Sequence, residues 1–365
     1  MDMQDSRIVM TLDAGGTNFV FSALQGGNHI VTPLRLPAEA TDLDACLNNL
    51  VAGFKGVLAR LPAKPVAISF AFPGPADYQS GIISGDLPNF PCFRGGVAMG
   101  PYLKQIFDIP VFINNDGSLF AYGEALTGAL PYVNARLREM GSIKQFNNLI
   151  GFTLGTGFGG GIVVDGHLLI GDNATGGDVY CLCNKKYPDL IAEEGVSIRA
   201  VKRVYRELSG DDTALEPVDI YNIAEGKAAG DREAAIASFA ELGEIAGDVI
   251  ATAVTLVDGI VVLGGGLTGA ARYIMPSLLK EMRRTLGTFD GQKTFGRVQM
   301  KVFDLDDEQE FSRFALGEQV SIPVYGSNAT VDYDPQKRTG VIISKQGASH
   351  SVAAGAYVYA LNHLQ

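Results

Sequence analysis

The sequence predicts an α/β protein of two domains with an internally duplicated architecture. Two glycine-rich segments, residues 11–17 and 153–159, each follow a short apolar run and precede a second β-rich run, so each is expected to join two paired strands. Strand-like and helix-like runs then alternate in both halves, as they do in α/β domains. With 365 residues, of which 47% are apolar, the chain is long enough for roughly two domains of about 150 residues each.

In the first half, apolar runs of strand type are separated by turn residues and amphipathic stretches. The predicted strands cover residues 7–11, 19–24, 29–34, 65–72 and 111–113. Helical spacing predicts helices over 42–61 and 99–107, and a third that follows Asp116 and ends at Gly128.

The second half repeats this alternation. Asp165-Gly166 is a favoured two-residue hairpin turn, and a glycine-rich loop follows over 171–177. The predicted elements are helices over 197–208, 233–257 and 270–286, a buried strand over 260–263, and a closing helix over 352–364. Residues 287–350 mix short strand-like runs with acidic turns, and no motif there indicates a role.

Composition excludes several classes of protein. A net charge of -11 argues against a general nucleic-acid or membrane-surface binder, which normally presents a basic face. No apolar run reaches the length of about 18 residues that a membrane span needs, and residues 1–5 lack the basic and apolar regions of a signal peptide. The four cysteines are too few for a disulfide framework in a chain of this length. We therefore expect a cytoplasmic protein with reduced thiols and with no nucleic acid or membrane as partner.

The glycine turns are candidate phosphate sites. Backbone N–H groups in a glycine turn form a concave nest for anionic oxygens, because no side chain blocks the approach of a phosphate. A single such turn would be structural about as often as functional. Its repetition, together with the run Gly264-Gly265-Gly266 after a predicted strand, favours one nucleotide clamped between the two domains.

Two common nucleotide motifs do not fit the sequence. Gly155, Gly157 and Gly160 match the spacing of the dinucleotide fingerprint, but a β-hairpin is predicted where that fingerprint opens a helix. Gly226-Lys227 is followed by Ala228, so the hydroxyl that a Walker loop supplies to magnesium is missing.

Asp116 is the strongest candidate for chemistry. It follows a predicted buried strand, at the carboxyl edge where α/β sheets bind their ligands. The structural alternative is an N-cap for the next helix. Phosphoryl transfer to an alcohol, however, needs a carboxylate that accepts the hydroxyl proton. Asp13, in the first glycine turn, is a candidate magnesium ligand, or alternatively a side chain that only stabilises the turn.

Five segments, in order and spacing, resemble the ROK family of sugar kinases and repressors: residues 13–17, 72–75, 87–91, 115–117 and 153–177. Bacterial glucokinases and related hexose kinases belong to this family. The resemblance covers residues 7–286 and resumes at the last helix. It implies the duplicated actin-like, ribonuclease-H-like ATPase fold, with an interdomain cleft, an N-terminal domain of residues 1–123 plus 351–365, and a C-terminal domain of residues 124–350.

The resemblance also implies a role for each matching residue. Asp116 corresponds to the catalytic base that deprotonates the sugar hydroxyl attacking the γ-phosphate. Sugar contacts fall on Gly74, Asn89, Asn115, Asp178 and Glu193. ATP contacts fall on Asp13, Gly15, Gly16, Thr17, Gly155, Thr156, Gly157, Gly264, Gly265 and Gly266. ATP and magnesium are the implied cofactors, with Asp13 holding the magnesium directly or through water.

The chain departs from the family in one loop. Where the family has Glu-Ile-Gly-His, this chain has Asp178-Val179-Tyr180-Cys181, so a sugar-contacting glutamate is one methylene shorter and a zinc-ligating histidine is replaced. The family's Cys-x-Cys-Gly-x-x-Gly-Cys loop is absent, and the sulfurs of Cys181 and Cys183 cannot fill the four-coordinate shell of structural zinc. We expect no zinc site and expect both thiols to be buried as small apolar groups. Because this loop shapes the sugar pocket in the family, the sugar is left open.

The function that the resemblance implies is that of an ATP-dependent hexose kinase of glucokinase type, in a family where homodimers are common. The alternatives are a kinase for N-acetylmannosamine, N-acetylglucosamine or fructose, and a catalytically silent sugar-binding regulator. Family repressors carry an N-terminal helix-turn-helix, whereas six residues precede the first predicted strand here, so no DNA-binding module is expected. Retention of both Asp13 and Asp116 favours a kinase over a silent regulator.

Overall fold

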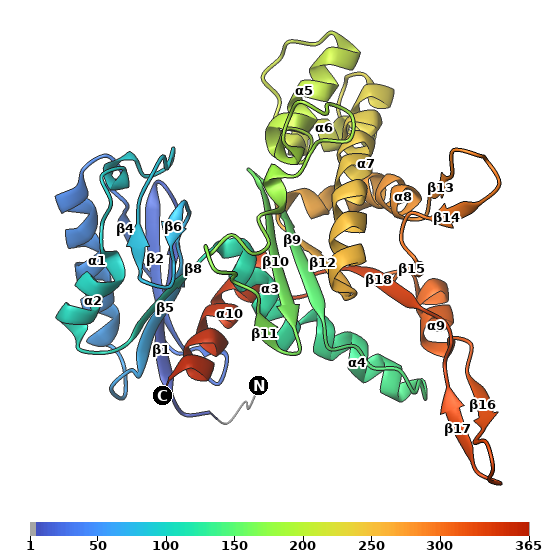
Figure 1. Cartoon of the computed structure of the whole chain (residues 1–365). Coiled ribbons are helices and arrows are strands. Elements are labelled where there is room, and N and C mark those ends of the chain that lie inside the picture. The colour runs from blue at the N-terminus through green and yellow to red at the C-terminus, as the bar shows by residue number, and fades with distance from the viewer. Residues whose placement is uncertain (1–4, 365) are drawn as a thin grey trace. The chain divides into compact units, whose positions relative to one another are not determined.

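The computed structural model describes residues 5–364 (Figure 1). The expectation that residues 1–5 form no signal peptide therefore falls almost entirely outside the described residues. Within this range the chain forms two compact units. The first contains the described residues up to Gly128, His167–Gly177 and the residues from Gln346 onward, and the second contains Ala129–Gly166 and Asp178–Lys345. No helix in the described part of the chain is both long and apolar enough to cross a membrane.

A mixed sheet forms the centre of the first unit. Its strands are β1 (Ile8–Ala14), β2 (Asn18–Gln25), β3 (Asn28–His29), β4 (Leu34–Pro37), β5 (Ala67–Ala71) and β8 (Val111–Asn114). The order is β3-β2-β1-β5-β8, with β4 also paired to β2. Strands β1 and β2 are antiparallel, whereas β1, β5 and β8 run parallel. All five residues of β5 are buried, as expected for a central parallel strand.

The expected strand over 29–34 is wrong as a continuous element. Strand β3 ends at His29 and β4 begins at Leu34, with irregular chain between them. Pro33 lies in this gap, and proline cannot donate a hydrogen bond to a strand ladder.

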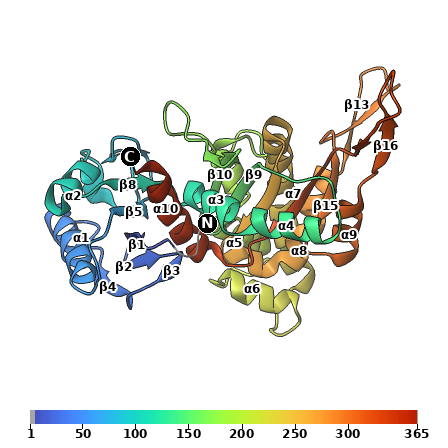
Figure 2. The same cartoon turned by 90° about the horizontal axis from the view of Figure 1, so that it is seen from below.

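Four helices complete the first unit: α1 (Leu43–Leu58), α2 (Met99–Phe107), α3 (Asp116–Leu126) and α10 (Ala348–His363). Shorter elements are β6 (Ala76–Asp77), β7 (Ile82–Ile83), β11 (His167–Leu168) and the 3-10 turn η1 (Pro91–Phe93). Helices α3 and α10 lie side by side in both views (Figures 1 and 2). A Cβ on Gly123 would approach the Ser351 carbonyl oxygen to 2.0 Å, so only glycine permits this close packing.

The second unit repeats the topology of the first. Its strands are β9 (Leu149–Leu154), β10 (Phe158–Val164), β12 (Ile260–Gly264), β15 (Lys301–Asp304) and β18 (Arg338–Ile343), in the order β10-β9-β12-β18-β15. Strands β9 and β10 are antiparallel, and β9, β12 and β18 run parallel. The series β10-β9-β12-β18 therefore has the same pairing directions as β2-β1-β5-β8, which confirms the expected duplication.

Helices of the second unit are α4 (Ala129–Glu139), α5 (Ile198–Ser209), α6 (Pro217–Ala224), α7 (Arg232–Val257), α8 (Ala271–Met282) and α9 (Glu308–Leu316). The 3-10 turns are η2 (Val179–Cys181), η3 (Ala192–Glu194) and η4 (Gly266–Ala270). Helix α8 ends at Met282, four residues before the predicted end, because the chain continues into a strand. Helix α7 packs along α8 through Gly243, where a Cβ would lie 2.2 Å from the Ile274 carbonyl oxygen.

Two separate hairpins occupy the region for which the sequence indicated no role. Strands β13 (Thr285–Gly287) and β14 (Thr294–Gly296) form one, and β16 (Val320–Pro323) and β17 (Thr330–Tyr333) form the other. Each is a two-stranded sheet of its own that extends from the body of the second unit (Figure 1).

Candidate functional site

The carboxyl edge of the first sheet gathers most of the polar residues predicted from the first half. Asp13 lies near the end of β1, Gly74 lies in the loop after β5, and Asp116 follows β8 by two residues. Because β1, β5 and β8 are parallel neighbours, these positions share one edge of the sheet. The side chains of Asp13 and Asp116 are both exposed there.

Asn115, rather than Asp116, is the N-cap of α3. The Asn115 side-chain oxygen accepts a hydrogen bond of 2.8 Å from the backbone N–H of Gly117. Asp116 is the first helical residue, and its Oδ1 accepts from the same N–H at 2.9 Å. The N-cap role considered for Asp116 is therefore taken by Asn115, whose side chain can accept the Gly117 N–H without the Asp116 carboxylate.

The surroundings of Asp116 favour its protonated form. Loss of solvation among the neighbouring protein atoms raises the pKa of its carboxyl, the Gly117 N–H opposes this rise, and the charge of Asp13 adds to it. The side chain nevertheless remains exposed, so the carboxyl is crowded on some sides and open to a ligand on another. A carboxylate with a raised pKa is a better proton acceptor than an ordinary surface aspartate.

The loop that carries Asn89 lies directly against the first glycine turn. A Cβ built on Gly16 would come within 3.3 Å of the Asn89 Cβ, so this turn and this loop are in contact. Phe90 anchors the loop, because its buried ring stacks on Phe19 at a centroid distance of 5.9 Å and contacts Phe72 at 4.8 Å. Asn89 itself is left exposed beside the turn.

Bare backbone, in contrast, marks the carboxyl edge of the second sheet. Gly155, Thr156 and Gly157 form the turn between β9 and β10, and Gly264 ends β12, the parallel neighbour of β9. Gly265 has a φ of +91°, and a Cβ there would lie 2.3 Å from the Leu154 carbonyl oxygen. A Cβ on Gly155 would meet no heavy atom within 4 Å, so its backbone faces open space.

The Glu193 side chain contacts the second glycine turn. Its Oε2 accepts a 2.9 Å hydrogen bond from the backbone N–H of Phe158, and a Cβ on Gly157 would lie only 2.6 Å from the same oxygen. Its Oε1 accepts from Arg199 at 2.9 Å, and Arg199 also pairs with Glu194. The sequence alone did not indicate Arg199, although two glutamates shortly before a helix that carries an arginine in its first turn suggest such a pairing.

Asp178 directly precedes the short turn η2, and its partial burial raises the pKa of its carboxyl. Cys181 donates its S–H to the Asp178 carbonyl oxygen at 3.0 Å. The expectation that Cys181 and Cys183 are buried is wrong, since both are exposed. Their neighbours in the loop, Val179 and Leu182, pack on the core of the second unit, and this leaves both thiols on the surface. In the range 5–364, no group of three or more histidine, cysteine, aspartate or glutamate residues is arranged to hold a metal ion.

Two lysines fasten this loop to the helices beneath it. Lys185 contacts Glu281, which is 5% exposed, and pairs with Glu244 at 3.0 Å. Lys186 pairs with Glu241 at 3.1 Å and with Glu244 at 3.2 Å. Burial alone would lower the pKa of Lys185, but its bonds to the two glutamates outweigh burial and raise it. Ion pairs therefore connect the loop to α7 and α8.

Two α/β units of matching topology, with glycine turns after their first strands, define the duplicated actin-like ATPase fold. The ROK family model matches residues 9–304, and the chain belongs to the ROK family.

Several proteins are similar to this chain. A glucokinase structure from Parabacteroides distasonis ATCC 8503 is 65% identical, with a TM-score of 0.92 and coverage of 100% of both chains. An N-acetylgalactosamine kinase from Shewanella sp. strain ANA-3 is 25% identical over 273 residues, which are 70% of this chain and 81% of that protein. A ROK family glucokinase from Streptomyces griseus, solved in complex with glucose and AMPPNP, shares the fold at 17% identity, with a TM-score of 0.61 and coverage of 96% and 98%.

Proposed function

We propose that this protein is an ATP-dependent hexose kinase of glucokinase type, which transfers the γ-phosphate of ATP to a sugar hydroxyl. The observation that carries the proposal is the exposed Asp116 carboxyl at the carboxyl edge of the first sheet, where the charge of Asp13 raises its pKa further and Asn115 is the N-cap of α3. The 65% identity to a glucokinase over the full length supports the same activity.

The chemistry assigned to Asp116 is that of a general base. The sugar hydroxyl oxygen forms a bond to the γ-phosphorus, the bond from that phosphorus to the bridging oxygen of ADP breaks, and the hydroxyl proton moves to Asp116. The assigned sugar contacts are Gly74, Asn89, Asn115, Asp178 and Glu193. The contact between Gly16 and Asn89 supports this assignment, because it joins a phosphate turn to a sugar-binding loop.

We assign ATP to the two glycine turns and to the glycines after β12. The residues are Asp13, Gly15, Gly16, Thr17, Gly155, Thr156, Gly157, Gly264, Gly265 and Gly266. Magnesium fits the exposed Asp13 carboxylate, since this ion typically takes one or two protein carboxylates, together with waters and substrate phosphates. When bound, it neutralises charge on the phosphates. Because ATP is the assigned donor, we place the protein in the cytoplasm. We also infer that the active protein is a homodimer.

An N-acetylhexosamine is the second candidate substrate, since a kinase for N-acetylgalactosamine is among the relatives. Asp178, one methylene shorter than glutamate, leaves more room in a loop that contacts sugar in this family. Fructose kinase activity and silent sugar binding complete the alternatives. A pocket that hydrogen-bonds each hydroxyl can discriminate strongly among such sugars.

The test is ADP release with ATP and magnesium over a panel of glucose, mannose, fructose, N-acetylglucosamine, N-acetylmannosamine and N-acetylgalactosamine. Glucose-dependent release that disappears in Asp116→Asn supports the proposal. Faster release with an N-acetylhexosamine would assign the second candidate. Sugar binding without release for any sugar would establish a silent regulator and refute the kinase.

A further inference from the structure

The hairpin β16–β17 is an amphipathic ribbon whose apolar face is open to solvent. Residues paired across an antiparallel ladder share a face, and alternate residues along each strand do too. The pairs Val320 with Tyr333 and Ile322 with Val331 therefore form one face, and Ser321 with Asp332 and Pro323 with Thr330 form the other. The side chains of the apolar face are 44–57% exposed. An isolated two-stranded ribbon is marginally stable in water. An exposed apolar face of this kind typically marks a surface that binds another protein.

Hairpin β13–β14 has the same design. Leu286 pairs with Phe295, and both are partly exposed, at 39% and 49%. Each ribbon also has an aromatic residue beyond its strands that is almost completely exposed: Phe289 in the first and Tyr325 in the second. Both ribbons therefore present an apolar face together with a projecting ring.

The β16–β17 ribbon is held firmly where it leaves the body of the second unit. Arg338, only 1% exposed, is ion-paired to Asp334 at the end of the ribbon. Asp334 also accepts a 3.1 Å hydrogen bond from the backbone N–H of Glu318, at the start of the ribbon. A base with a buried ion pair fixes the direction of the ribbon, so its exposed face is a built feature of the fold.

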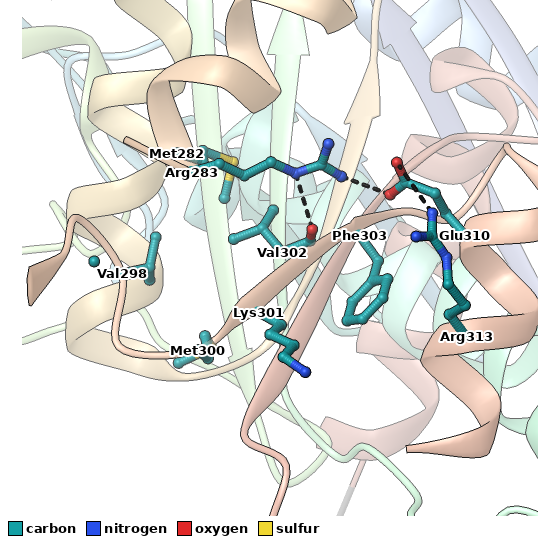
Figure 3. Close-up of a pocket in the computed structure, with 10 residues that line it drawn as sticks. Met282, Arg283, Val298, Met300, Lys301, Val302, Phe303, Glu310 and Arg313 are labelled. Carbon is teal, nitrogen blue, oxygen red and sulfur yellow. Dashed lines mark hydrogen bonds and ion pairs between the residues drawn. The ribbon is translucent and has the colours of Figure 1, made fainter. Parts of the chain in front are cut away.

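Next to β14 lies a groove that can receive a side chain projecting from such a ribbon (Figure 3). It is lined by residues of α8, β14, β15 and α9, including Met300 and Phe303, and has a volume of about 340 Å³. Arg283 lies at its edge, donating to the Val302 carbonyl oxygen at 3.0 Å and pairing with Glu310 (Figure 3). Arg313 and Lys301 also line the groove, where Arg313 pairs with Glu310 and Lys301 with Glu318.

The two ribbon segments differ in their content of charged residues. Residues 283–297 contain four basic residues and one aspartate, whereas residues 318–334 contain three acidic residues and neither lysine nor arginine. Most of these charges already have partners within the same unit: Arg283 pairs with Glu310, Arg297 with Asp248, Asp334 with Arg338 and Glu318 with Lys301. Contact between the ribbons therefore depends mainly on their apolar faces. A second copy of the chain offers both ribbons, so two contacts between apolar faces can form reciprocally about a two-fold axis.

We propose that the β16–β17 ribbon of one copy docks by its apolar face on the β13–β14 ribbon and the adjoining groove of a second copy. This assignment rests on the homodimer inferred above and names its surface. At about 200 Å² for each aromatic side chain, the exposed parts of Phe289, Phe295, Tyr325 and Tyr333 amount to roughly 600 Å² per copy. The aliphatic side chains bring this close to the roughly 800 Å² per partner of a stable interface.

The test uses neighbouring residues on opposite faces of each ribbon. Val331→Lys puts a charge on the apolar face of β17, and Thr330→Lys puts the same charge on its polar face. Phe295→Lys and Thr294→Lys form the matching pair on β14. Sedimentation equilibrium measures the dimer dissociation constant, and thermal melting checks that each variant is folded. We expect Val331→Lys and Phe295→Lys to weaken the dimer about 10-fold or more, and the two threonine variants to leave it unchanged.

Mixing the two weakened variants identifies the partner of each ribbon. A heterodimer of Val331→Lys with Phe295→Lys keeps one contact between an intact β16–β17 ribbon and an intact β13–β14 ribbon, so mixing should restore part of the dimer. A dimer that survives Val331→Lys would refute this surface and leave the homodimer standing. A dimer sensitive to Val331→Lys but not to Phe295→Lys would show that β16–β17 pairs with itself and would refute the assigned partner. A monomeric parent protein would refute both the homodimer and its surface, while ADP release by the same samples tests the kinase separately.

Discussion

The carboxyl edges of the two sheets occupy equivalent positions in a repeated topology and both carry a glycine turn, yet they differ in the residues beside that turn. The first edge carries the carboxylates of Asp13 and Asp116 and the amide of Asn115, whereas the second presents bare glycine backbone at Gly155 and Gly266. In the proposed assignment, the carboxylate of the first edge accepts a proton, and the backbone of the second edge binds an anion.

The largest effect is expected at the first edge. Asp116→Asn keeps the shape and the Oδ1 acceptor but removes the proton-accepting carboxylate, so kcat should fall by a factor of about 10²–10⁴. Sugar affinity, measured by calorimetry, should change little by comparison. If sugar binding fell as far as turnover, Asp116 would be a binding residue, and the contrast between the edges would be lost.

The second edge should respond in affinity. Gly155→Ala introduces a methyl group into open space, so the melting temperature should not change, while the KM for ATP should rise about 10-fold, equivalent to losing one hydrogen bond to a charged group. Gly265→Ala is the matched contrast. Its φ of +91° and the Leu154 carbonyl oxygen 2.3 Å from the added Cβ predict a clear loss of thermal stability. A melting temperature lowered by Gly155→Ala would mean that the first glycine is structural.

A smaller effect on stability and on sugar affinity is expected at the ion pairs that connect the loop of Asp178 to α7 and α8. Lys185→Met removes one of the two cations that pair with the buried Glu281 and leaves Arg284 as the other, so the melting temperature should fall by about 2–4 °C. The KM for sugar should rise by a factor of about 3–10, with the KM for ATP unchanged. Lys202→Met, which breaks the more exposed pair with Glu216, is the control and should have almost no effect. Equal changes in both KM values would argue against a loop specific to the sugar.

The smallest effect concerns the stability of the first edge. Because the folded protein raises the pKa of Asp116 above its usual 3.8, the ionised carboxyl destabilises the fold at neutral pH, and this loss disappears below pH 3.8. Asp116→Asn should therefore melt slightly above the parent protein at pH 7, by at most about 2 °C because one side of the group is solvated. The gain should shrink as the pH falls toward 4. A stability loss at pH 7 would contradict the direction of the pKa shift.

Sequence patterns predicted correctly those elements that depend only on residues close together in the chain. Helix α2 covers the predicted residues 99–107, and both glycine turns join antiparallel strands as expected. Adjacent residues of similar chemistry were harder to separate. Asn115 and Asp116 are both favoured N-caps, and only the backbone geometry shows that Asn115 takes this role.

Features that depend on distant residues could not be predicted. Lys185 and Glu281 are separated by 96 positions, and no spacing rule connects them. The alternation of polar and apolar residues in β16 and β17 is visible in the sequence, but the exposure of its apolar face depends on the surrounding fold. The buried-thiol expectation for Cys181 and Cys183 failed for the same reason, since composition does not locate a loop.

The central claim is that the carboxylates of the first edge perform the chemistry, whereas the second edge contributes only to binding the nucleotide. The most direct test measures kcat and the KM for ATP side by side, at saturating sugar, for Asp116→Asn and Gly155→Ala. The account predicts that the first variant loses kcat with a nearly unchanged KM, and that the second raises KM with kcat nearly unchanged. A loss of kcat of similar size in both variants would contradict the division of labour between the two sheets.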